Sequence, residues 1–132
     1  MKLFPLSQHT PQLADPANFT GSATLTRMDD VCGRPHVNAY RVSFEPGART
    51  AWHTHSGPQL LLVVEGRCRL QKAGEPVREV EAGSVVCIEP GERHWHGASA
   101  DVPMTHVALN LDAATTWMEK VSDEEYAGTA GS

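Results

Sequence analysis

The sequence predicts an all-β fold, built as a small barrel or sandwich. Short apolar or alternating segments follow one another along the chain, and Gly and Pro residues separate them. The chain has 132 residues, which is the size of one ordinary domain. Its hydrophobic fraction of 40% and charged fraction of 20% are typical of a globular protein rather than a disordered one. One barrel would account for nearly the whole chain.

We expect an N-terminal arm over residues 1–20, because this stretch is polar and interrupted by prolines. The barrel is predicted to follow over residues 21–121. Gly66 is expected to separate two of its strands, since glycine punctuates strand patterns. The strands are expected at Ser22–Arg27, His36–Phe44, Gln59–Glu65, Arg67–Gln71, Val77–Val80, Val85–Ile88, His94–Gly97, Met104–Leu111 and Trp117–Val121.

Residues 122–132 are predicted to form a short C-terminal helix and a tail. The run Ser122-Asp123-Glu124-Glu125 has the pattern of a capping box, in which the first and last side chains each bond the other's backbone N–H. A helix through Tyr126 should follow, and we expect it to fray over Gly128–Ser132.

Charge and cysteine content exclude several classes of protein. Sixteen acidic residues against eleven basic ones give a net charge of −5 without any basic run, which argues against nucleic-acid and anionic-membrane partners. No apolar stretch approaches the ~18–20 residues that a membrane span needs. The three cysteines, Cys32, Cys68 and Cys87, lack the CxxC spacing of a zinc knuckle. We therefore expect reduced thiols in a cytoplasmic protein.

Five of the seven histidines fall between His53 and His106. His53-Thr54-His55 and His94-Trp95-His96 each place two imidazoles on one face of a strand, because strand side chains alternate. Imidazole is the commonest transition-metal ligand, so the pattern favours a site for Mn, Fe, Co, Ni, Cu or Zn. The plainer alternative is a set of ordinary surface or core histidines. Trp52 and Trp95 have the opposite parity and should lie outside the barrel.

The spacing around these histidines resembles the two motifs of the cupin family. The resemblance implies a single-domain, double-stranded, jelly-roll-like β-barrel that holds one metal ion. By position, His53, His55 and His94 match the three histidine ligands, and Gln59 stands where the usual motif has Glu. The first motif is matched by Gly47, His53-Thr54-His55, Gln59 and Gly66, and the second by Gly83, Glu89-Pro90-Gly91 and His94.

A glutamine at position 59 has a chemical consequence. Three neutral imidazoles and a neutral amide would leave a divalent metal its full charge, which suits Lewis-acid chemistry and argues modestly against an oxygenase. The alternative is that Gln59 only hydrogen-bonds a bound water.

A longer resemblance is to a subgroup of small bacterial cupins that includes manganese-dependent hydroxynitrile lyases, in which Gln at this position is normal. The subgroup implies one divalent metal, manganese first, with iron, cobalt, nickel or zinc also suitable. The metal would hold the hydroxyl of a cyanohydrin while His106 takes its proton and cyanide leaves; His96 is the second candidate base. The residues that carry this resemblance are Phe19–Gly21, Phe44–His55, Pro90–Ala98, Met104–His106 and Trp117–Glu119.

Strand phasing predicts four pocket-wall residues, Tyr40, Val42, Leu61 and Asn110, although the apolar ones could simply fill the barrel. The resemblance to this subgroup implies a metal-dependent lyase that acts on cyanohydrins. The alternatives are a metal-dependent dioxygenase of the same fold and a non-catalytic protein that binds a small metabolite. We expect a homodimer or homotetramer that assembles through sheet faces and the N-terminal arm.

Overall fold

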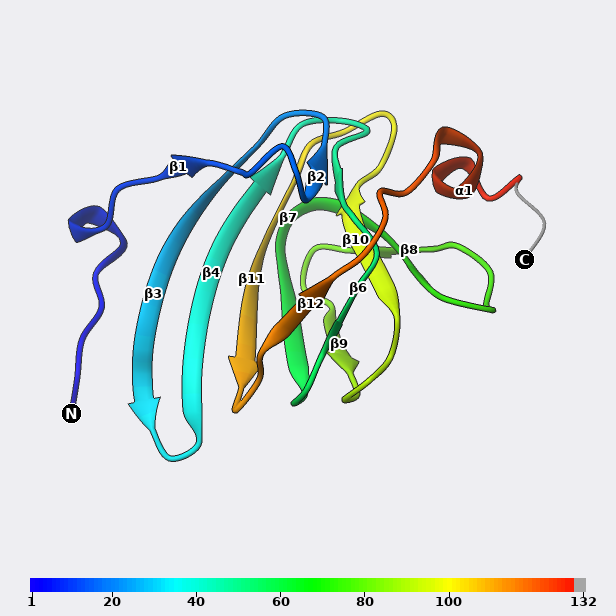
Figure 1. Cartoon of the computed structure of the whole chain (residues 1–132). Coiled ribbons are helices and arrows are strands. Elements are labelled where there is room, and N and C mark those ends of the chain that lie inside the picture. Colours follow the sequence, from blue (N-terminus) through cyan, green and yellow to red (C-terminus); the bar gives the residue numbers. More distant parts are fainter. Residues whose placement is uncertain (130–132) are drawn as a thin grey trace.

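The computed structural model describes residues 1–129 and consists mainly of antiparallel strands (Figure 1). The last expected tail residues, 130–132, lie outside this part of the chain. The elements are the 3-10 turn Leu6–Gln8, β1 (Gln12–Leu13), β2 (Phe19–Thr20), β3 (Ala23–Gly33), β4 (His36–Phe44), β5 (Arg49–Thr50), β6 (His53–His55), β7 (Gln59–Lys72), β8 (Arg78–Glu81), β9 (Val85–Ile88), β10 (His94–Ala98), β11 (Met104–Leu111), β12 (Thr115–Trp117) and α1 (Asp123–Ala127).

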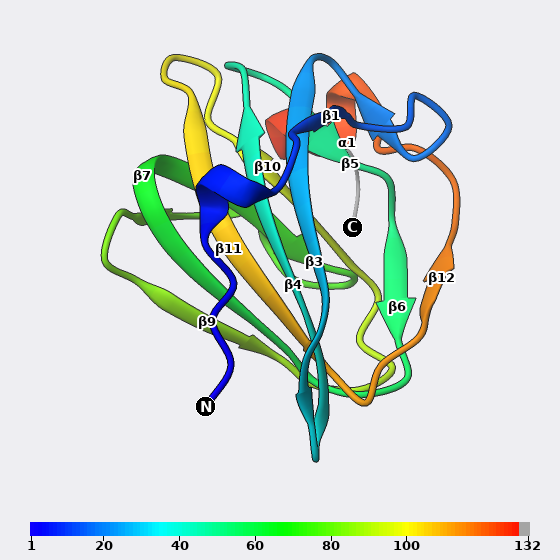
Figure 2. The same ribbon diagram turned by 90° about the vertical axis from the view of Figure 1, so that its left-hand side faces the viewer.

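Two curved sheets share the long strand β7. The first runs β1-β3-β4-β11-β7-β9, and the second joins β2, β5, β10, β7 and β8, with β6 and β12 along its edge. Figure 2 shows β7 and β9 on one side and β6 and β12 on the other, with β3, β4 and β11 between them in that view. The all-β prediction is confirmed, and the two sheets curl around a common interior.

Glycine 66 bends a strand instead of ending one. The expected strands Gln59–Glu65 and Arg67–Gln71 are one continuous β7, whose first half pairs with β11 and β9 and whose second half pairs with β10 and β8. Gly66 has φ +74°, and a Cβ there would collide with the carbonyl oxygen of Pro103. A glycine is therefore required where β7 passes from one sheet to the other.

The last expected strand is displaced along the sequence. The structure has β12 at Thr115–Trp117, and the prediction of a strand over Trp117–Val121 is wrong apart from its first residue. Pairing with β6 sets this register, since Thr115 lies opposite His55 and Trp117 opposite His53. Beyond Trp117 the chain exchanges backbone hydrogen bonds with Trp52 through Met118 and Glu119, and then enters α1.

Alternation along the strands separates the interior of the barrel from its surface. On β11 the side chains of Met104, His106, Ala108 and Asn110 are all buried, whereas those of Val107, Leu109 and Leu111 are partly exposed. An apolar cluster that includes Phe44 and Met104 packs in the interior. It adjoins the polar site described below, because the Phe44 ring centre lies 5.3 Å from that of His106.

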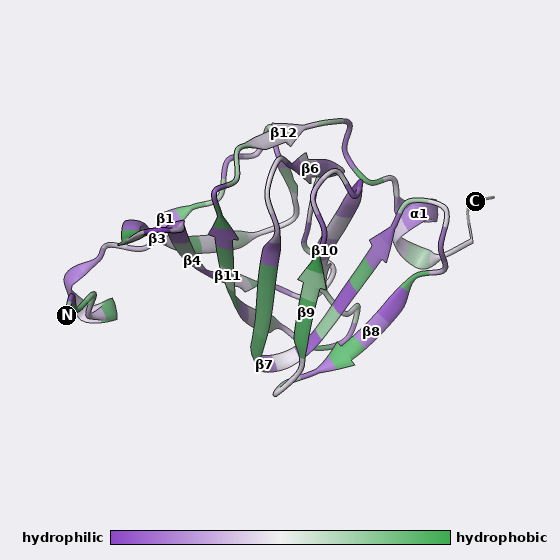
Figure 3. Cartoon of the chain, turned by 90° about the horizontal axis from the view of Figure 1, so that it is seen from below, coloured by the Kyte–Doolittle hydropathy of each residue, from purple (hydrophilic) through white to green (hydrophobic). Residues whose placement is uncertain are grey.

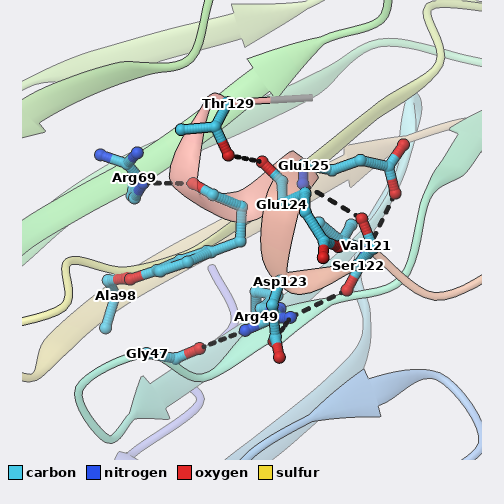
Figure 4. A network of polar contacts seen from close by, with 11 residues as sticks. Gly47, Arg49, Arg69, Ala98, Val121, Ser122, Asp123, Glu124, Glu125 and Thr129 are labelled. Carbon is cyan, nitrogen blue, oxygen red and sulfur yellow. Dashed lines mark hydrogen bonds and ion pairs between the residues drawn. The ribbon is translucent and has the colours of Figure 1, made fainter. Parts of the chain in front are cut away.

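The C-terminal segment covers the outside of the second sheet. The capping box is confirmed: the Ser122 hydroxyl accepts from the Glu125 amide, and the Glu125 carboxylate accepts from the Ser122 amide (Figure 4). Trp52 and Trp95 lie outside the barrel, as their parity predicts, and are buried with Val121 beneath this segment. α1 has only five residues, and no helix in residues 1–129 is long and apolar enough to span a membrane.

One arginine attaches this segment to the barrel. Arg49 on β5 is 6% exposed, and its guanidinium donates to the carbonyl oxygens of Gly47 and Val121 and to the Asp123 carboxylate (Figure 4). Its guanidinium carbon lies 4.7 Å from the centre of the Tyr126 ring. Gly47 precedes β5, whereas Val121 and Asp123 lie at the start of the C-terminal helix. Arg49 therefore connects β5 directly to the start of α1.

We predict that Arg49→Met destabilises the protein by about 2 kcal/mol, because it leaves the buried Val121 carbonyl without a donor. Arg67→Met is the matched control: the Arg67 side chain is 50% exposed and its nearest carboxylate oxygen, on Glu79, is 4.0 Å away. The control should change stability by less than about 0.5 kcal/mol. Urea unfolding measures both free energies, and equal losses in the two variants would contradict the role of Arg49.

Candidate metal centre and active site

A cavity of about 470 Å³ opens between the two sheets. This size lies within the range of about 300–1,000 Å³ that is usual for small-molecule sites. Histidines from three strands line it, together with aromatic and aliphatic side chains. Its lining includes His53 and His55 of β6, His96 of β10 and His106 of β11. The cavity therefore brings together residues that lie more than fifty positions apart in sequence.

The strand pairings explain why the histidines meet. His94 on β10 lies opposite His53 on β6 in the register, and the centres of their rings are 4.2 Å apart. The ring centres of His53 and His55 are 4.9 Å apart, and those of His55 and His94 are 5.3 Å apart. Each pair of i and i+2 histidines points inward from its strand because their side chains share one face. All three rings are buried.

Hydrogen bonds from Nδ1 orient these three rings. The Nδ1 atoms of His53 and His94 donate to the carbonyl oxygens of Ala51 and Glu92, at 2.9 Å and 2.8 Å. A carbonyl can only accept, so Nδ1 carries the proton and Nε2 keeps its lone pair in each neutral ring. His55 Nδ1 is 2.9 Å from the Thr115 hydroxyl oxygen. Such partners are the usual means of presenting Nε2 to a metal.

The side-chain oxygen of Gln59 points toward the same group of histidines. Gln59 Nε2 donates to Asn110 Oδ1 at 2.8 Å, and this bond turns Gln59 Oε1 toward His94 Nε2, 3.3 Å away. Because the proton of His94 is on Nδ1, two electron-pair donors face each other in a buried site. Burial lowers the pKa of His94, which opposes a second proton on its ring. A cation between the two atoms would satisfy both.

The residues therefore fit a divalent metal ion. A nitrogen from each of His53, His94 and His96 lies within 4.8 Å of the other two. The sequence predicted His55 in place of His96, and the structure brings both of them to the cavity. The Nε2 atoms of His55 and His96 are buried and have no hydrogen-bond partner among the described residues. Imidazole nitrogens with an amide oxygen suit a transition metal such as manganese, iron, cobalt, nickel or zinc.

His96 and His106 form a buried pair beside this centre. His106 Nε2 lies 2.9 Å from His96 Nδ1, and both rings are almost completely buried. His96 Nε2 and His106 Nδ1 have no hydrogen-bond partner among the described residues. One proton is shared in the contact between two neutral rings, so one of the two outer nitrogens must be a donor and the other an acceptor. The pair can therefore accept a proton at one end and donate one at the other.

Burial keeps these imidazoles neutral. The pKa values of His55 and His106 are lowered to about 4, mainly by desolvation, and the neighbouring His94 contributes to the lowering for His55. Desolvation also holds the pKa values of His53 and His96 well below the usual 6.5, with nearby imidazoles acting in the same direction. At neutral pH all of them can act as metal ligands or as proton acceptors.

The expected pocket-wall residues have different locations. Tyr40 and Val42 on β4 line the cavity. Asn110 also lines it, and in addition holds Gln59 through their amide contact. Leu61 is fully buried and packs with Ile88 and with the lining residues Ala108 and Tyr40, but it does not itself line the cavity. Its side chain alternates inward as predicted.

Sequence reasoning missed several residues of the site. Thr115 contacts His55, and the Trp117 ring centre is 4.7 Å from that of His53. The Thr50 hydroxyl accepts from the His96 amide, and the Phe44 ring centre is 5.3 Å from that of His106. Placing β12 over Thr115–Trp117 would have revealed the first two, because their parity matches that of His55 and His53 across the ladder.

Comparison with known proteins finds similarity over the part of the chain that contains the histidine cluster. The family description of the cupin domain matches residues 40–110. A (R)-mandelonitrile lyase from Granulicella tundricola is 45% identical over 111 residues, which cover 82% of this chain and 85% of the relative. The residues that the cupin domain matches include the strands β6, β10 and β11, which carry the histidine cluster.

Solved structures agree with this result. A cupin-like protein from Thermotoga maritima superposes with a TM-score of 0.83 at 36% identity, covering 91% of this chain and 94% of that one. A polyketide cyclase from Streptomyces resistomycificus gives a TM-score of 0.73 at 18% identity, covering 96% of this chain and 90% of that one, and shares the fold. The family match spans over half of the 132 residues, and the chain belongs to the cupin family.

Proposed function

We propose that this protein is a metal-dependent hydroxynitrile lyase, which cleaves cyanohydrins to cyanide and an aldehyde or ketone and also catalyses the reverse reaction. Its similarity to a (R)-mandelonitrile lyase, at 45% identity, supports the reaction class. The observation that carries the proposal is the convergence of His94 Nε2 and Gln59 Oε1, two lone-pair atoms 3.3 Å apart in a buried site beside further neutral imidazoles.

We propose His53, His55, His94 and Gln59 as the metal ligands. The first three have Nδ1 in a hydrogen bond, and Gln59 is oriented by Asn110. A divalent ion held there, manganese in the first instance, would act as a Lewis acid toward the substrate hydroxyl. All four ligands are neutral, so the ion would keep its full positive charge and favour the loss of the hydroxyl proton.

In the proposed reaction, His96 and His106 would accept and donate protons. Cleavage requires removal of the hydroxyl proton while the carbon–carbon bond to cyanide breaks, and cyanide then takes up a proton to leave as hydrogen cyanide. We assign His106 as the base, with His96 sharing its proton through the 2.9 Å contact. A proton accepted at one outer nitrogen and released at the other leaves the pair neutral overall, which suits its dry surroundings.

The remaining cavity wall suits the carbon skeleton of the substrate. Phe44, Val42 and Ala108 supply apolar surface near the histidine pair, and Tyr40 closes the wall toward Arg27, whose guanidinium carbon lies 5.5 Å from the Tyr40 ring centre. These groups exclude water from the reacting atoms and offer no competing nucleophile. A small aldehyde or ketone with an apolar substituent is the expected product.

Substitutions at the proposed ligands test the metal site. In His53→Ala and His55→Ala we expect metal content, measured by mass spectrometry of the purified protein, to fall at least about tenfold, because each removes a neutral donor. His96→Ala should keep its metal, since the proposal gives His96 a proton-transfer role. His36→Ala, at a side chain that is 44% exposed, is the control and should match the parent protein. Loss of metal in His96→Ala together with retention in His55→Ala would contradict the assignment, and would make His96 the ligand instead of His55.

Activity tests the base. Mandelonitrile cleavage, followed as aldehyde release without oxygen, should fall by at least about 100-fold in His106→Ala while metal content stays unchanged. The control His36→Ala should keep full activity. Full activity after complete metal removal would rule out the metal-dependent proposal, and full activity in His106→Ala would rule out the assigned base.

The same assay separates the two alternative functions. A dioxygenase would consume oxygen and show no product in its absence, whereas a lyase is indifferent to oxygen. A protein that only binds a small metabolite would release no aldehyde under either condition.

A further inference from the structure

The cavity has a cationic side chain at its outer end that the proposed function does not use. Arg27 on β3 is one of the residues that line the cavity. In the strand register it lies opposite Tyr40, which in turn lies opposite Ala108 on β11. These three side chains form one row along the inner face of the first sheet, because side chains opposite each other share a face. Charged residues are normally kept away from such a face, so the position of Arg27 indicates a ligand.

The neighbours of Arg27 orient its guanidinium and leave donors free. The guanidinium carbon lies 5.5 Å from the centre of the Tyr40 ring, which holds the side chain against the cavity wall. Arg27 Nε lies 3.4 Å from Asp29 Oδ1, and the two side chains are 59% and 54% exposed, so this ion pair is weak. Because Asp29 contacts Nε, the two Nη groups are available to a second carboxylate.

The charges of the cavity favour an anionic group near Arg27. Among the described residues, Asp15 on the N-terminal arm is the carboxylate of the lining. The Ala14 amide donates to the Ala23 carbonyl oxygen, which places Asp15 beside the start of β3. Arg27 lies four residues farther along that strand, roughly 14 Å away. Asp15 Oδ1 also accepts from the Ala17 amide. The negative charge of the lining is therefore remote from Arg27 and has a partner of its own.

The location of Arg27 fits a group at the far end of the substrate. His106, the proposed base, lies opposite Val42, whereas Arg27 lies opposite Tyr40, two residues along β4. Since β3 and β11 flank β4, the backbones of Arg27 and His106 are roughly 12 Å apart. Both side chains line the cavity between them, and one aromatic ring can bridge the remaining distance. Figure 3 shows β3, β4 and β11 side by side, with β6 and β12 at another side of the barrel.

We propose that the protein acts on cyanohydrins that carry a carboxylate at the end remote from the hydroxyl, and that Arg27 binds this carboxylate. The inference rests on the proposed function, because it names the substrate class of the same site. A guanidinium binds a carboxylate through two parallel N–H···O bonds, which are stronger than neutral hydrogen bonds. The apolar part of the substrate would lie between the reacting carbon and the carboxylate. Arg27 determines specificity and takes no part in the bond cleavage.

Cleavage of three nitriles by the manganese-loaded protein tests the proposal: mandelonitrile, its para-carboxylate and its para-carboxamide. The parent protein should have a KM for the carboxylate at least about fivefold below that for the carboxamide, which has a similar size and no charge. Arg27→Met should abolish this difference by raising the KM for the carboxylate while kcat stays unchanged, because the lost contact is equal in the ground and transition states. Arg27→Lys should keep part of the preference, since it keeps the charge.

Arg41→Met is the matched control. Arg41 lies opposite Thr26 in the register, one residue from the inward pair of Arg27 and Tyr40, and belongs to the outer face of the same sheet. The substitution removes the same charge and should leave the three KM values unchanged. A parent protein that cleaves mandelonitrile without preferring the carboxylate, or an Arg27→Met variant that keeps the preference, would overturn the inference and leave the proposed function intact. Failure to cleave any of the three nitriles would overturn both.

Discussion

The candidate metal site depends on a hydrogen bond from a histidine ring to a backbone carbonyl, which occurs twice. In both His53 and His94, Nδ1 donates to the carbonyl of the residue two positions earlier, Ala51 and Glu92. This local contact fixes the tautomer of each ring, so that Nε2 carries a lone pair and faces the interior. Because β6 and β10 pair at these two histidines, the lone pairs converge. Without the two carbonyls, the same strands would hold imidazoles of undefined orientation and protonation.

Burial of the five imidazoles costs folding stability, but it keeps the rings neutral and held in place for a ligand. Enclosing five imidazoles in the barrel lowers their pKa values and leaves three ring nitrogens without a hydrogen-bond partner among the described residues. Buried polar atoms without partners destabilise a fold. The surrounding structure offsets this cost through the Phe44 and Met104 cluster inside the barrel and through the Arg49 contacts with the C-terminal segment. The result is a set of neutral donors held in place before any ligand arrives.

Much of this arrangement could be predicted from sequence, because it follows from parity. Histidines two residues apart must share a strand face, and His106, Ala108 and Asn110 must share another. The cupin-like spacing of Gly47, His53 and Gln59 predicted the fold and also suggested the candidate ligands. The bounds of β4, β9 and β11 agree with the prediction because glycine, proline or an acidic turn closes each strand.

The remainder depends on pairing between distant strands, which sequence patterns do not reveal. The position of β12 follows from its ladder with β6, so Thr115 could not be connected with His55 in advance. Asn110 was expected in the pocket wall, but its amide also orients Gln59, a contact set by the β7 and β11 register. Leu61 has the predicted parity, yet its depth in the barrel removes it from the cavity lining. Gly66 predicts a strand boundary, whereas the structure has a bend there, because a bend and an end have the same local signal.

The most direct test of the account is the protonation of the histidine rings, measured by long-range proton–nitrogen NMR on the metal-free protein. At pH 7 we expect His53 and His94 to be neutral and protonated at Nδ1, because burial lowers their pKa values below the usual 6.5 and the Ala51 and Glu92 carbonyls hold that proton. Added manganese should then perturb the Nε2 signals of His53 and His94. Rings that are cationic at pH 7, or neutral rings protonated at Nε2, would contradict the account.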